Sequence, residues 1–363
     1  MSETPIFVMT PVYNGARFIR ESVESILGQT YANLRILLMD NGSTDGTADI
    51  VAGLADQDDR IVLVTQRHTS LVETRNRQLE MAAGDLISFQ DADDVSEPDR
   101  LQKQVDYLRS HPECVGVSGA GRHIDAQGNP TGHIVRFQPA ENADPTWFPA
   151  REPSLMPFTV MRRAAVQAVG GFRHAFHTDD TDLYWRLRRM GSLVNLPDIV
   201  GSYRLHANSD TGQSIQTTRI MALTTQLSAL SAARVSRGQP EVVFAAEKYD
   251  IYRSAGSMSG IYETGCEELS RDEAEHLRLQ YASRVLQLLE LRHQTPNLQD
   301  CQFIRDAYQR HPVRSPANRK ELRRLVAVIG ARLLRKGRYR EAWALTPMRH
   351  QFEATARAVL KPV

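Results

Sequence analysis

The stretch Leu86-Ile87-Ser88-Phe89-Gln90-Asp91-Ala92-Asp93-Asp94 decides the fold of this chain. Its first four residues form a short, mainly apolar run, which is typical of a buried strand, and an acidic cluster follows. Two earlier stretches have the same order. Ile6 to Thr10 leads into the polar segment Pro11 to Asn14, and Leu34 to Met39 leads into Asp40 to Asp45. We therefore expect several strands that each end in a polar loop.

Helical periodicity fills the segments between these strands. Ala16 to Gln29 and Leu71 to Ala83 carry apolar residues at helical spacing, and another helix follows Thr47. Ile61 to Thr65 supplies one more strand. This alternation predicts an α/β fold with a mostly parallel sheet and flanking helices on both faces. Because ligands bind beyond the carboxyl ends of parallel strands, the polar loops are expected to meet on one rim.

The chain changes character after about residue 115. Up to about residue 204 the pattern is mixed, with a strand at Phe158 to Arg162, a hairpin turn at Asp125 to Gly128 and a helix at Asp180 to Met190. From about residue 216 onward, turn signals become rare and helical periodicity dominates. We place a boundary near Ser214, with one domain at residues 1–215 and a helical C-terminal region at residues 216–363.

The composition and the N-terminal sequence argue against a secreted or membrane-spanning protein, and the overall charge does not indicate a partner. The 363 residues are 41% hydrophobic and 24% charged, with a net charge of +1, and we expect no nucleic acid among the partners. The three cysteines lack metal-ligand spacing, which indicates buried thiols in a reducing compartment. Met1 to Pro5 does not resemble a signal peptide, and Leu325 to Leu334 is too short to span a bilayer. We expect a cytoplasmic protein, either free or resting on the inner face of the cell membrane.

An ordered series of motifs resembles the inverting family 2 glycosyltransferases, which have the Rossmann-like GT-A fold. The resemblance covers about residues 4 to 210, and the order of the motifs makes it specific. The matching segments are Thr10-Pro11-Val12-Tyr13-Asn14-Gly15, Asp40 to Thr47, Thr74-Arg75-Asn76, Asp91-Ala92-Asp93-Asp94, Gly170-Gly171-Phe172, Asp179-Asp180-Thr181-Asp182-Leu183 and Tyr203-Arg204-Leu205-His206.

The resemblance implies a role for each acidic motif. Asp93 would contact the metal directly, with Asp91 nearer the donor ribose or a metal-bound water, and Asp180 would be the catalytic base. The chain departs from the family pattern at Asn41, where a second acidic residue is usual, and at Asp179, where glutamate is usual. Asp179 therefore remains an alternative catalytic residue. No Gln-x-x-Arg-Trp segment follows Asp182, which favours transfer of a single sugar over processive synthesis.

The chemistry of the acidic cluster supports a divalent metal site. Mg²⁺ or Mn²⁺ suits one or two carboxylates together with substrate phosphates, and Asp91 and Asp93 supply two carboxylates just past a strand. An EF-hand calcium loop starting at Asp91 is excluded, because its sixth and twelfth positions would be Ser96 and Gln102 instead of Gly and Glu. His206 is a further candidate for contact with the metal or diphosphate, and the alternative for it is a structural role.

The residues that resemble the family's nucleotide pocket are Thr10, Pro11, Tyr13, Asp40 and Arg75. Tyr13 can stack on a base, Asp40 can accept a hydrogen bond from the imide of uracil or thymine, and Arg75 can pair with phosphate or base oxygens. The alternative is that Pro11 and Asp40 only shape turns. The sequence has no Walker motif and no Gly-x-Gly-x-x-Gly after a strand, so ATPase and dinucleotide-binding functions lack support.

The function expected from this resemblance is metal-dependent, inverting transfer of one sugar from a UDP- or dTDP-linked donor to a hydroxyl. The acceptor would be a glycan or a lipid-linked glycan in bacterial surface polysaccharide assembly. The first alternative is a sugar nucleotidyltransferase, which should carry a glycine-rich phosphate loop where this chain has Thr10 to Asn14. The second is a non-catalytic protein that binds nucleotide sugars.

The C-terminal segment has a strongly basic composition. Residues 313–363 contain thirteen Lys and Arg against three Glu, a net charge of +10. Apolar residues at helical spacing form one stripe, made of Leu322, Leu325, Val326, Ile329 and Leu333. Such a basic amphipathic helix can lie on an anionic membrane. The alternative is that the stripe packs on the preceding helices or on a second subunit of a homo-oligomer.

Overall fold

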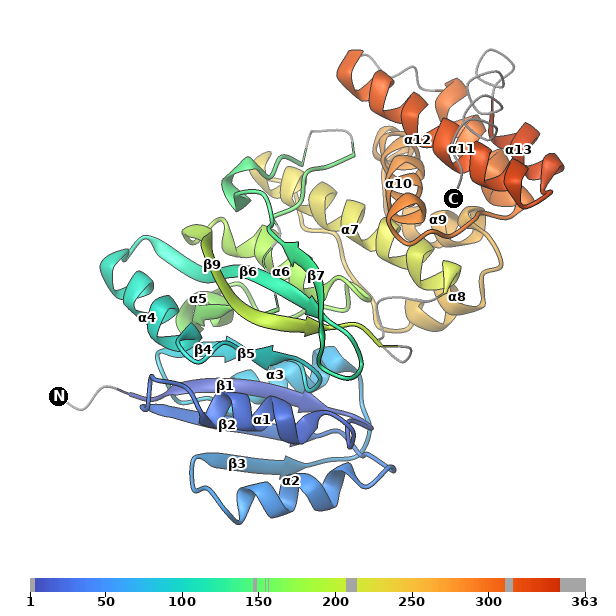
Figure 1. Cartoon of the computed structure of the whole chain (residues 1–363). Helices are drawn as coiled ribbons and strands as arrows, with labels where there is room; N and C mark the ends of the chain where they lie inside the picture. Colours follow the sequence, from blue (N-terminus) through green and yellow to red (C-terminus); the bar gives the residue numbers. More distant parts are fainter. Residues whose placement is uncertain are drawn as a thin grey trace. The chain divides into compact units, whose positions relative to one another are not determined.

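The computed structural model divides into two compact units (Figure 1). The sheet unit comprises Met1–Ala143, Pro153–Arg173 and Asp179–Asn208, and the helical unit comprises Asp144–Glu152, His174–Thr178 and Ser209–Val363. The short segments Asp144–Glu152 and His174–Thr178 pack with the helical unit, although the sequence analysis placed them within the first domain. The structure describes residues 4–145, 149–153, 155, 157–206, 214–310 and 316–346.

Nine strands of the described residues form one mixed sheet in the order β3-β2-β1-β4-β8-β6-β9-β5, with β7 paired to β6. The first four strands are parallel, as predicted, and they confirm the α/β class. Their apolar runs make them suitable for burial on both faces of a sheet. These strands are β1 (Ile6–Val12), β2 (Leu34–Asp40), β3 (Ile61–Thr65) and β4 (Leu86–Phe89).

The later strands introduce antiparallel pairing into the sheet. β8 lies antiparallel between β4 and β6, β9 runs parallel to β6, and β5 and β7 pair antiparallel with β9 and β6. The predicted turn at Asp125 joins β6 to β7, and its carboxylate accepts hydrogen bonds from the backbone N–H groups of Gln127 and Asn129. The bounds are β5 (Val95–Ser96), β6 (Cys114–Ile124), β7 (Pro130–Val135), β8 (Val160–Arg162) and β9 (Ser192–Arg204).

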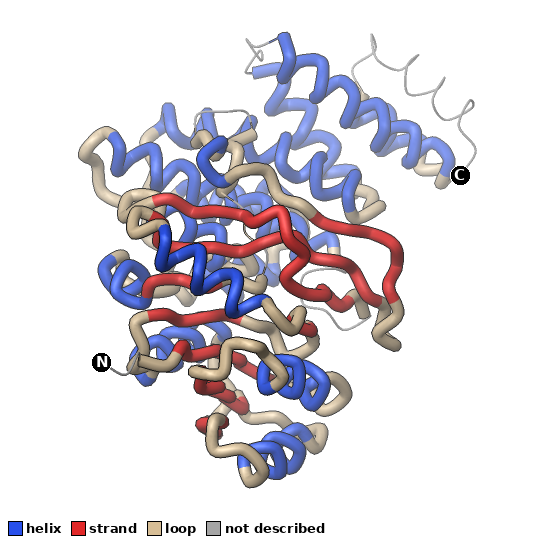
Figure 2. The backbone as a smooth tube through the Cα atoms, turned by 60° about the vertical axis from the view of Figure 1, so that its left-hand side comes forward, coloured by secondary structure: helices blue, strands red, loops and turns tan. Residues whose placement is uncertain are grey.

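Helices cover both faces of this sheet (Figure 2). Successive strand residues point to opposite faces, so Ile6 and Val8 face one core while Met9 faces the other. The first core also contains residues of α1 (Ile19–Leu27), α2 (Thr47–Ala55) and α4 (Arg100–Ser110). The second contains residues of α3 (Leu71–Met81), α5 (Arg163–Ala168) and α6 (Asp179–Leu187), and the short 3-10 helix η1 (Ala140–Asn142) contributes Ala140.

Two helix starts decide where site residues fall. Ser70 and Glu73 form a capping box, which fixes the start of α3 and places Arg75 in its first turns. The second start is that of α4. Val95–Ser96 pairs with β9, so the helix begins only at Arg100, and the Asp99 side chain makes no capping hydrogen bond.

The helical unit has its own apolar core, to which each of the described helices from α7 to α13 contributes buried side chains. Ser214 and Ser270 cap the N-termini of α7 and α10. Within the described residues, every helix is too short or too polar to cross a membrane. The helices are α7 (Ile215–Ser236), α8 (Lys248–Ser254), α9 (Met258–Cys266), α10 (Arg271–Leu291), α11 (Leu298–Arg310), α12 (Pro316–Arg335) and α13 (Tyr339–Leu345).

The apolar stripe of the basic segment lies on α12 and is buried in this core. Leu322, Leu325, Val326, Ile329 and Leu333 are at most 9% exposed. The stripe therefore packs within the helical unit and is not presented to a membrane. Part of the basic charge is also used internally, because Arg324 pairs with Glu290 and Glu321, and Arg332 donates to the backbone oxygen of Leu289. Arg314, Arg349, Arg357 and Lys361 lie outside the described residues.

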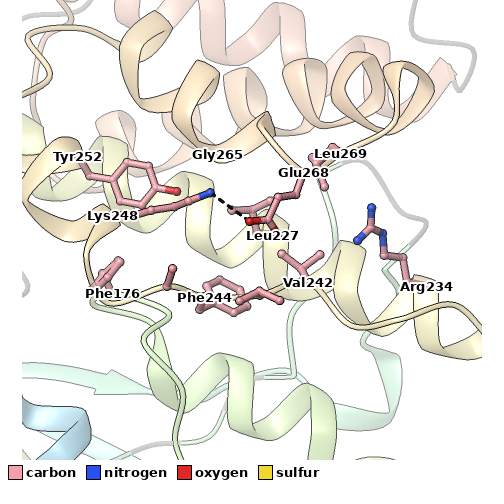
Figure 3. Close-up of a pocket in the computed structure, with 12 residues that line it drawn as sticks. Phe176, Leu227, Arg234, Val242, Phe244, Lys248, Tyr252, Gly265, Glu268 and Leu269 are labelled. Atoms are coloured by element: carbon pink, nitrogen blue, oxygen red, sulfur yellow. Dashed lines mark ion pairs between the residues drawn. The ribbon is translucent and has the colours of Figure 1, made fainter.

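A small pocket in the helical unit is lined by residues of α7, α8 and α9 (Figure 3). Its wall is mainly apolar and includes Leu227, Val242 and Tyr252, while Lys248 and Glu268 form an ion pair at 3.9 Å. Its volume of about 20 Å³ is room for about one or two water molecules. It is too small for a sugar or a nucleotide.

Candidate active site

The loops that follow β1 and β2 are tied together by hydrogen bonds. Val12 and Asp40 lie side by side at the carboxyl ends of these strands. Asn14 has a positive φ of 51°, and its side-chain oxygen accepts a hydrogen bond of 2.8 Å from the backbone N–H of Thr44. In return, the Asn14 N–H donates to the Ser43 hydroxyl. The two polar loops predicted to meet on one rim therefore do so.

The structure places the predicted nucleotide-pocket residues at different depths. Thr10 is fully buried within β1, and Pro11 continues the same strand instead of ending it. Asp40 is only 3% exposed, and its carboxylate accepts a hydrogen bond of 3.1 Å from the Ser43 N–H. Tyr13, by contrast, is 49% exposed, and its ring centroid lies 4.2 Å from that of His68. The Tyr13–His68 pair is thus the aromatic surface that this rim offers to a flat ligand.

Asn41 holds the loop after β3 against this rim. Its side-chain oxygen accepts hydrogen bonds from the Gln66 amide and the Thr69 N–H, and its amide nitrogen donates to the Thr69 carbonyl. An ionised aspartate has no hydrogen to donate, so it could not make the last of these bonds. The departure from the family pattern at this position therefore has a local structural reason.

Arg75 joins two acidic segments that are far apart in the sequence. It donates to Asp179 at 2.6 Å and to Asp91 at 3.3 Å, and its guanidinium lies 5.5 Å from the centroid of the Phe172 ring. The Arg75 and Asp179 side chains are nearly buried, whereas that of Asp91 is 39% exposed. One side chain thus connects the loop after β4 with the start of α6.

Asp180 is exposed, but the protein around it restricts its hydration. This desolvation, followed by the negative charge of Asp179, raises the pKa of Asp180 to about 6, and Arg75 opposes the shift. Its carboxylate accepts a hydrogen bond of 2.6 Å from the Thr181 N–H. A carboxylate with a pKa near 6 is a stronger base than an ordinary aspartate and is still mostly ionised at neutral pH.

Asp182, two residues further along α6, has a structural role. It is fully buried and forms ion pairs of 2.5 Å with Arg173 and 2.8 Å with Arg186. The backbone at Gly171, two residues before Arg173, is also constrained. Gly171 has a φ of 68°, and a Cβ added there would lie 2.6 Å from Asn76 Oδ1, so this position favours glycine.

The acidic cluster after β4 combines three carboxylates with different surroundings. Desolvation raises the pKa of Asp91, opposed by Arg75 and reinforced by Asp93. Asp94 is fully buried, and desolvation together with Asp93 and Asp91 raises its pKa well above the usual range. Asp93 Oδ2 lies 2.8 Å from His206 Nε2. The cluster therefore concentrates negative charge beside an imidazole.

Arg204 organises this cluster, although the sequence analysis gave it no role. Its backbone N–H donates to Asp94 Oδ1, its Nε donates to the carbonyl of Asp93, and a further nitrogen pairs with Glu21 at 2.6 Å. The guanidinium lies 4.8 Å from the centroid of the Phe18 ring, and the His206 ring is also 4.8 Å from Phe18. The motif Tyr203-Arg204-Leu205-His206 contained this signal, but we considered only its histidine.

The side chains on this rim that could coordinate a metal suit a divalent cation that also binds a diphosphate. In the described residues, no group of three His, Cys, Asp or Glu side chains converges as a metal cage. Asp91 and Asp93 nevertheless supply two carboxylates, and His206 contacts the second. Mg²⁺-type sites commonly use one or two carboxylates and complete their coordination with substrate phosphates and water. The cluster has the chemistry of such a shared site.

Comparison with known proteins identifies relatives of this chain. The sequence model for glycosyl transferase family 2 matches residues 7–170. EpsE of Bacillus subtilis (strain 168), named as a glycosyltransferase, is 34% identical over 219 residues, which cover 56% of this chain and 74% of EpsE. TuaG of the same organism is 35% identical over 115 residues, which cover 31% of this chain and 46% of TuaG. An uncharacterised glycosyltransferase of Haemophilus influenzae is 36% identical over 126 residues, 34% of this chain and 50% of that protein. This chain thus spans about half the length of the last two relatives.

Solved structures with the same fold include two with bound nucleotide sugars. The mannosyltransferase PcManGT of Pyrobaculum calidifontis, solved with GDP-Man and Mn²⁺, has a TM-score of 0.52 at 16% identity, covering 99% of this chain and 88% of that chain. S. aureus TarS 1-349 in complex with UDP-GlcNAc has a TM-score of 0.50 at 14% identity, covering 97% and 91%. At this level of identity the likeness establishes the fold.

Proposed function

Because this chain belongs to glycosyltransferase family 2, we propose that it transfers one sugar from a nucleoside-diphosphate donor to a hydroxyl acceptor, with inversion and with a divalent metal. The observation that carries this proposal is the position of Arg75. Its guanidinium pairs with Asp91 of the metal cluster and with Asp179, the neighbour of Asp180. The groups proposed to bind the leaving diphosphate and to activate the acceptor therefore lie within reach of one side chain.

In this proposal Asp180 is the catalytic base. It is exposed, so an acceptor hydroxyl can reach it, and its pKa of about 6 suits proton removal at neutral pH. Asp179 is a weaker candidate, because it is buried and paired with Arg75 at 2.6 Å. We assign Asp179 the role of holding Arg75 and of raising the pKa of Asp180. With a single base and direct attack by the acceptor oxygen, the reaction inverts the anomeric configuration.

Asp91 and Asp93 are the proposed metal ligands, with His206 beside Asp93. When bound, Mn²⁺ or Mg²⁺ would supply positive charge that stabilises the departing diphosphate. Arg204 fixes the backbone of the cluster through the Asp93 carbonyl and the Asp94 carboxylate. A related fold is known in complex with GDP-Man and Mn²⁺, and this supports the assignment by analogy only.

The donor is proposed to be UDP- or dTDP-linked. The exposed Tyr13–His68 pair offers a stacking surface for the base, and Asp40 offers a carboxylate for the imide N–H of uracil or thymine. The acceptor is proposed to be a glycan or lipid-linked glycan of the bacterial surface. The name of TuaG refers to teichuronic acid biosynthesis, which supports this class of acceptor. A cytoplasmic site of action follows from the proposed donor and remains part of the proposal.

A screen of nucleotide sugars with Mn²⁺ tests the proposal. We expect release of a nucleoside diphosphate that depends on Mn²⁺, whereas a sugar nucleotidyltransferase would form pyrophosphate. Asp180→Asn should retain donor binding but lower transfer by at least about 100-fold, the usual contribution of a general base. Asp49→Asn makes the same chemical change at an exposed position of α2 and should leave the rate unchanged. Near-normal turnover of Asp180→Asn, or a product that retains the donor's anomeric configuration by proton NMR, would contradict the mechanism.

A further inference from the structure

The last described helix, α13, presents two large aromatic side chains to solvent. Tyr339 is 60% exposed and Trp343 is 50% exposed. They are four residues apart in the helix, so they lie on the same face, and the exposed Arg340 lies beside them. Large aromatic side chains clustered at the surface of a soluble protein commonly mark an interaction site.

Basic residues lie close to this pair in the chain. Arg335 is the last residue of α12 and Lys336 follows it in the short turn into α13 (Figure 1), and both are exposed, as is Arg340. Among the described residues, no acidic side chain lies within ion-pair distance of these three. Arg338, in the same turn, is by contrast paired with Glu341 at 2.9 Å. We call Arg335, Lys336, Tyr339, Arg340 and Trp343 the aromatic–basic face.

The opposite side of α13 fixes this face in place. Ala342 is 1% exposed and Leu345 is fully buried in the core of the helical unit. Arg338 also donates to the Thr295 hydroxyl, which ties the start of α13 to the loop before α11. The exposure of Tyr339 and Trp343 is therefore a property of how α13 packs.

We propose that the aromatic–basic face docks on an anionic lipid surface. Tyr and Trp rings have an apolar body and a polar tip, which suits the headgroup region of a bilayer. Three unpaired cations beside them complement negatively charged lipid headgroups. This face differs from the apolar stripe of α12, because Tyr339 and Trp343 are exposed where the stripe is buried.

Charge argues against two other occupants of the face. The chain's own residues 347–363 carry Arg349, Arg357 and Lys361 against Glu353, a net charge of +2, so that segment does not complement a basic surface. A second copy related by a twofold axis would place the same three cations opposite themselves. An anionic lipid surface supplies the negative charge itself, so it can complement these three cations without any acidic residue of this protein.

Sedimentation of the full chain with vesicles tests the proposal. We expect binding to phosphatidylcholine vesicles that contain phosphatidylglycerol, little binding to pure phosphatidylcholine, and loss of binding at high salt. Lys336→Gln with Arg340→Gln should weaken binding roughly 30-fold, because each basic group near an anionic surface contributes about fivefold. Tyr339→Ser with Trp343→Ser should weaken binding by about tenfold or more while retaining the salt dependence.

A matched control is available in the same unit. Arg237→Gln with Arg253→Gln removes the same charge from two other exposed positions and should not change vesicle binding. Thermal unfolding of each variant checks that the fold is intact. Absence of wild-type binding, or equal binding to both kinds of vesicle, would overturn the proposal. So would an aromatic variant that changes self-association in sedimentation velocity but not vesicle binding, since the face would then belong to a second copy.

Discussion

Replacing Asp179 by asparagine should move the pH dependence of transfer toward acid. Asp179 lies beside Asp180, and after desolvation its negative charge is the largest cause of the raised pKa of Asp180. Asparagine is similar in size and can still accept a hydrogen bond from Arg75, but it carries no charge. Removing that charge makes ionisation of Asp180 easier, so the pKa of Asp180 falls.

The size of the effect follows from the titration of Asp180. With a pKa of about 6, roughly 90% of Asp180 is ionised at pH 7 and roughly 10% at pH 5. The base acts in its ionised form, so the wild-type rate should fall about tenfold for each pH unit below about 6. In the Asp179→Asn variant, Asp180 stays ionised to a lower pH than in the wild type. At about pH 5 the variant should therefore keep a larger fraction of its own plateau rate than the wild type keeps. Its plateau should be lower, because a carboxylate with a lower pKa is a weaker base.

Initial rates of transfer at saturating donor, measured from about pH 4 to pH 9, test this expectation. Asp49→Asn is the control, since it removes one exposed negative charge from α2 and should leave the profile where it is. A wild-type rate that is flat between about pH 5 and pH 7, or a variant profile displaced toward alkaline pH, would refute the reasoning. If Asp179 were the base, the variant would instead lose most of its activity, and the fall in rate at low pH would disappear with it.

Two further substitutions test Asp93, a carboxylate of the proposed metal site, and Asp182, a carboxylate with a structural role. Asp93→Ala should abolish metal-dependent donor binding, because the diphosphate loses its counter-charge; calorimetry with UDP and Mn²⁺ measures this, and unchanged affinity would remove Asp93 from the metal site. Asp182→Ala should lower the free energy of unfolding by about 3–5 kcal/mol, because it removes the carboxylate that pairs with the buried Arg186. Urea unfolding measures this loss, and a change below about 0.5 kcal/mol would show that the ion pair is not needed for stability.

The strands with uninterrupted apolar runs were predictable from the sequence. The predicted Ile61 to Thr65 coincides with β3, and the strand within Leu86 to Phe89 coincides with β4. A strand buried on both faces must be apolar at nearly every position, so its limits are visible without knowledge of its neighbours. The helices between these strands were predictable for a similar reason, because one apolar face repeats at helical spacing.

β9 was not predicted, because its pattern depends on its partners. It contains Pro197 and Gly201, which interrupt the usual signals of a strand. Its pairing with β6 shifts register between Ser118 and Ala120, opposite the segment that contains Pro197. Gly201 is needed for packing, because a Cβ there would lie 2.4 Å from the Phe158 ring. These constraints come from tertiary contacts and leave no periodic pattern in the sequence.

The candidate site was predictable in its parts but not in its connections. Polar loops after parallel strands indicated where Asp40, Asp91 and Asp93 would lie. The ion pair between Arg75 and Asp179 joins residues 104 positions apart, and neither residue type specifies the other as its partner. The sequence analysis therefore assigned Arg75 only to the nucleotide. Arg204 was missed because its contacts to Asp93 are made through a backbone carbonyl, which no side-chain motif records.

The charge balance of the site supports the proposal that a cation accompanies the donor. The negative charges of Asp91, Asp93, Asp179 and Asp180 are partly offset by the guanidinium of Arg75, which already pairs with Asp91 and Asp179. A diphosphate arriving alone would lie beside these carboxylates, in surroundings where desolvation together with neighbouring carboxylates already raises the pKa of Asp91 and Asp180 and so disfavours anions. Arg75 could contact the diphosphate only by weakening its pairs with Asp91 or Asp179, which would leave those carboxylates less compensated. A divalent cation between Asp91, Asp93 and the diphosphate removes both difficulties, because it offsets the carboxylates and the phosphates together. The residues on this rim therefore support the proposed metal dependence of donor binding, independently of the family to which the chain belongs.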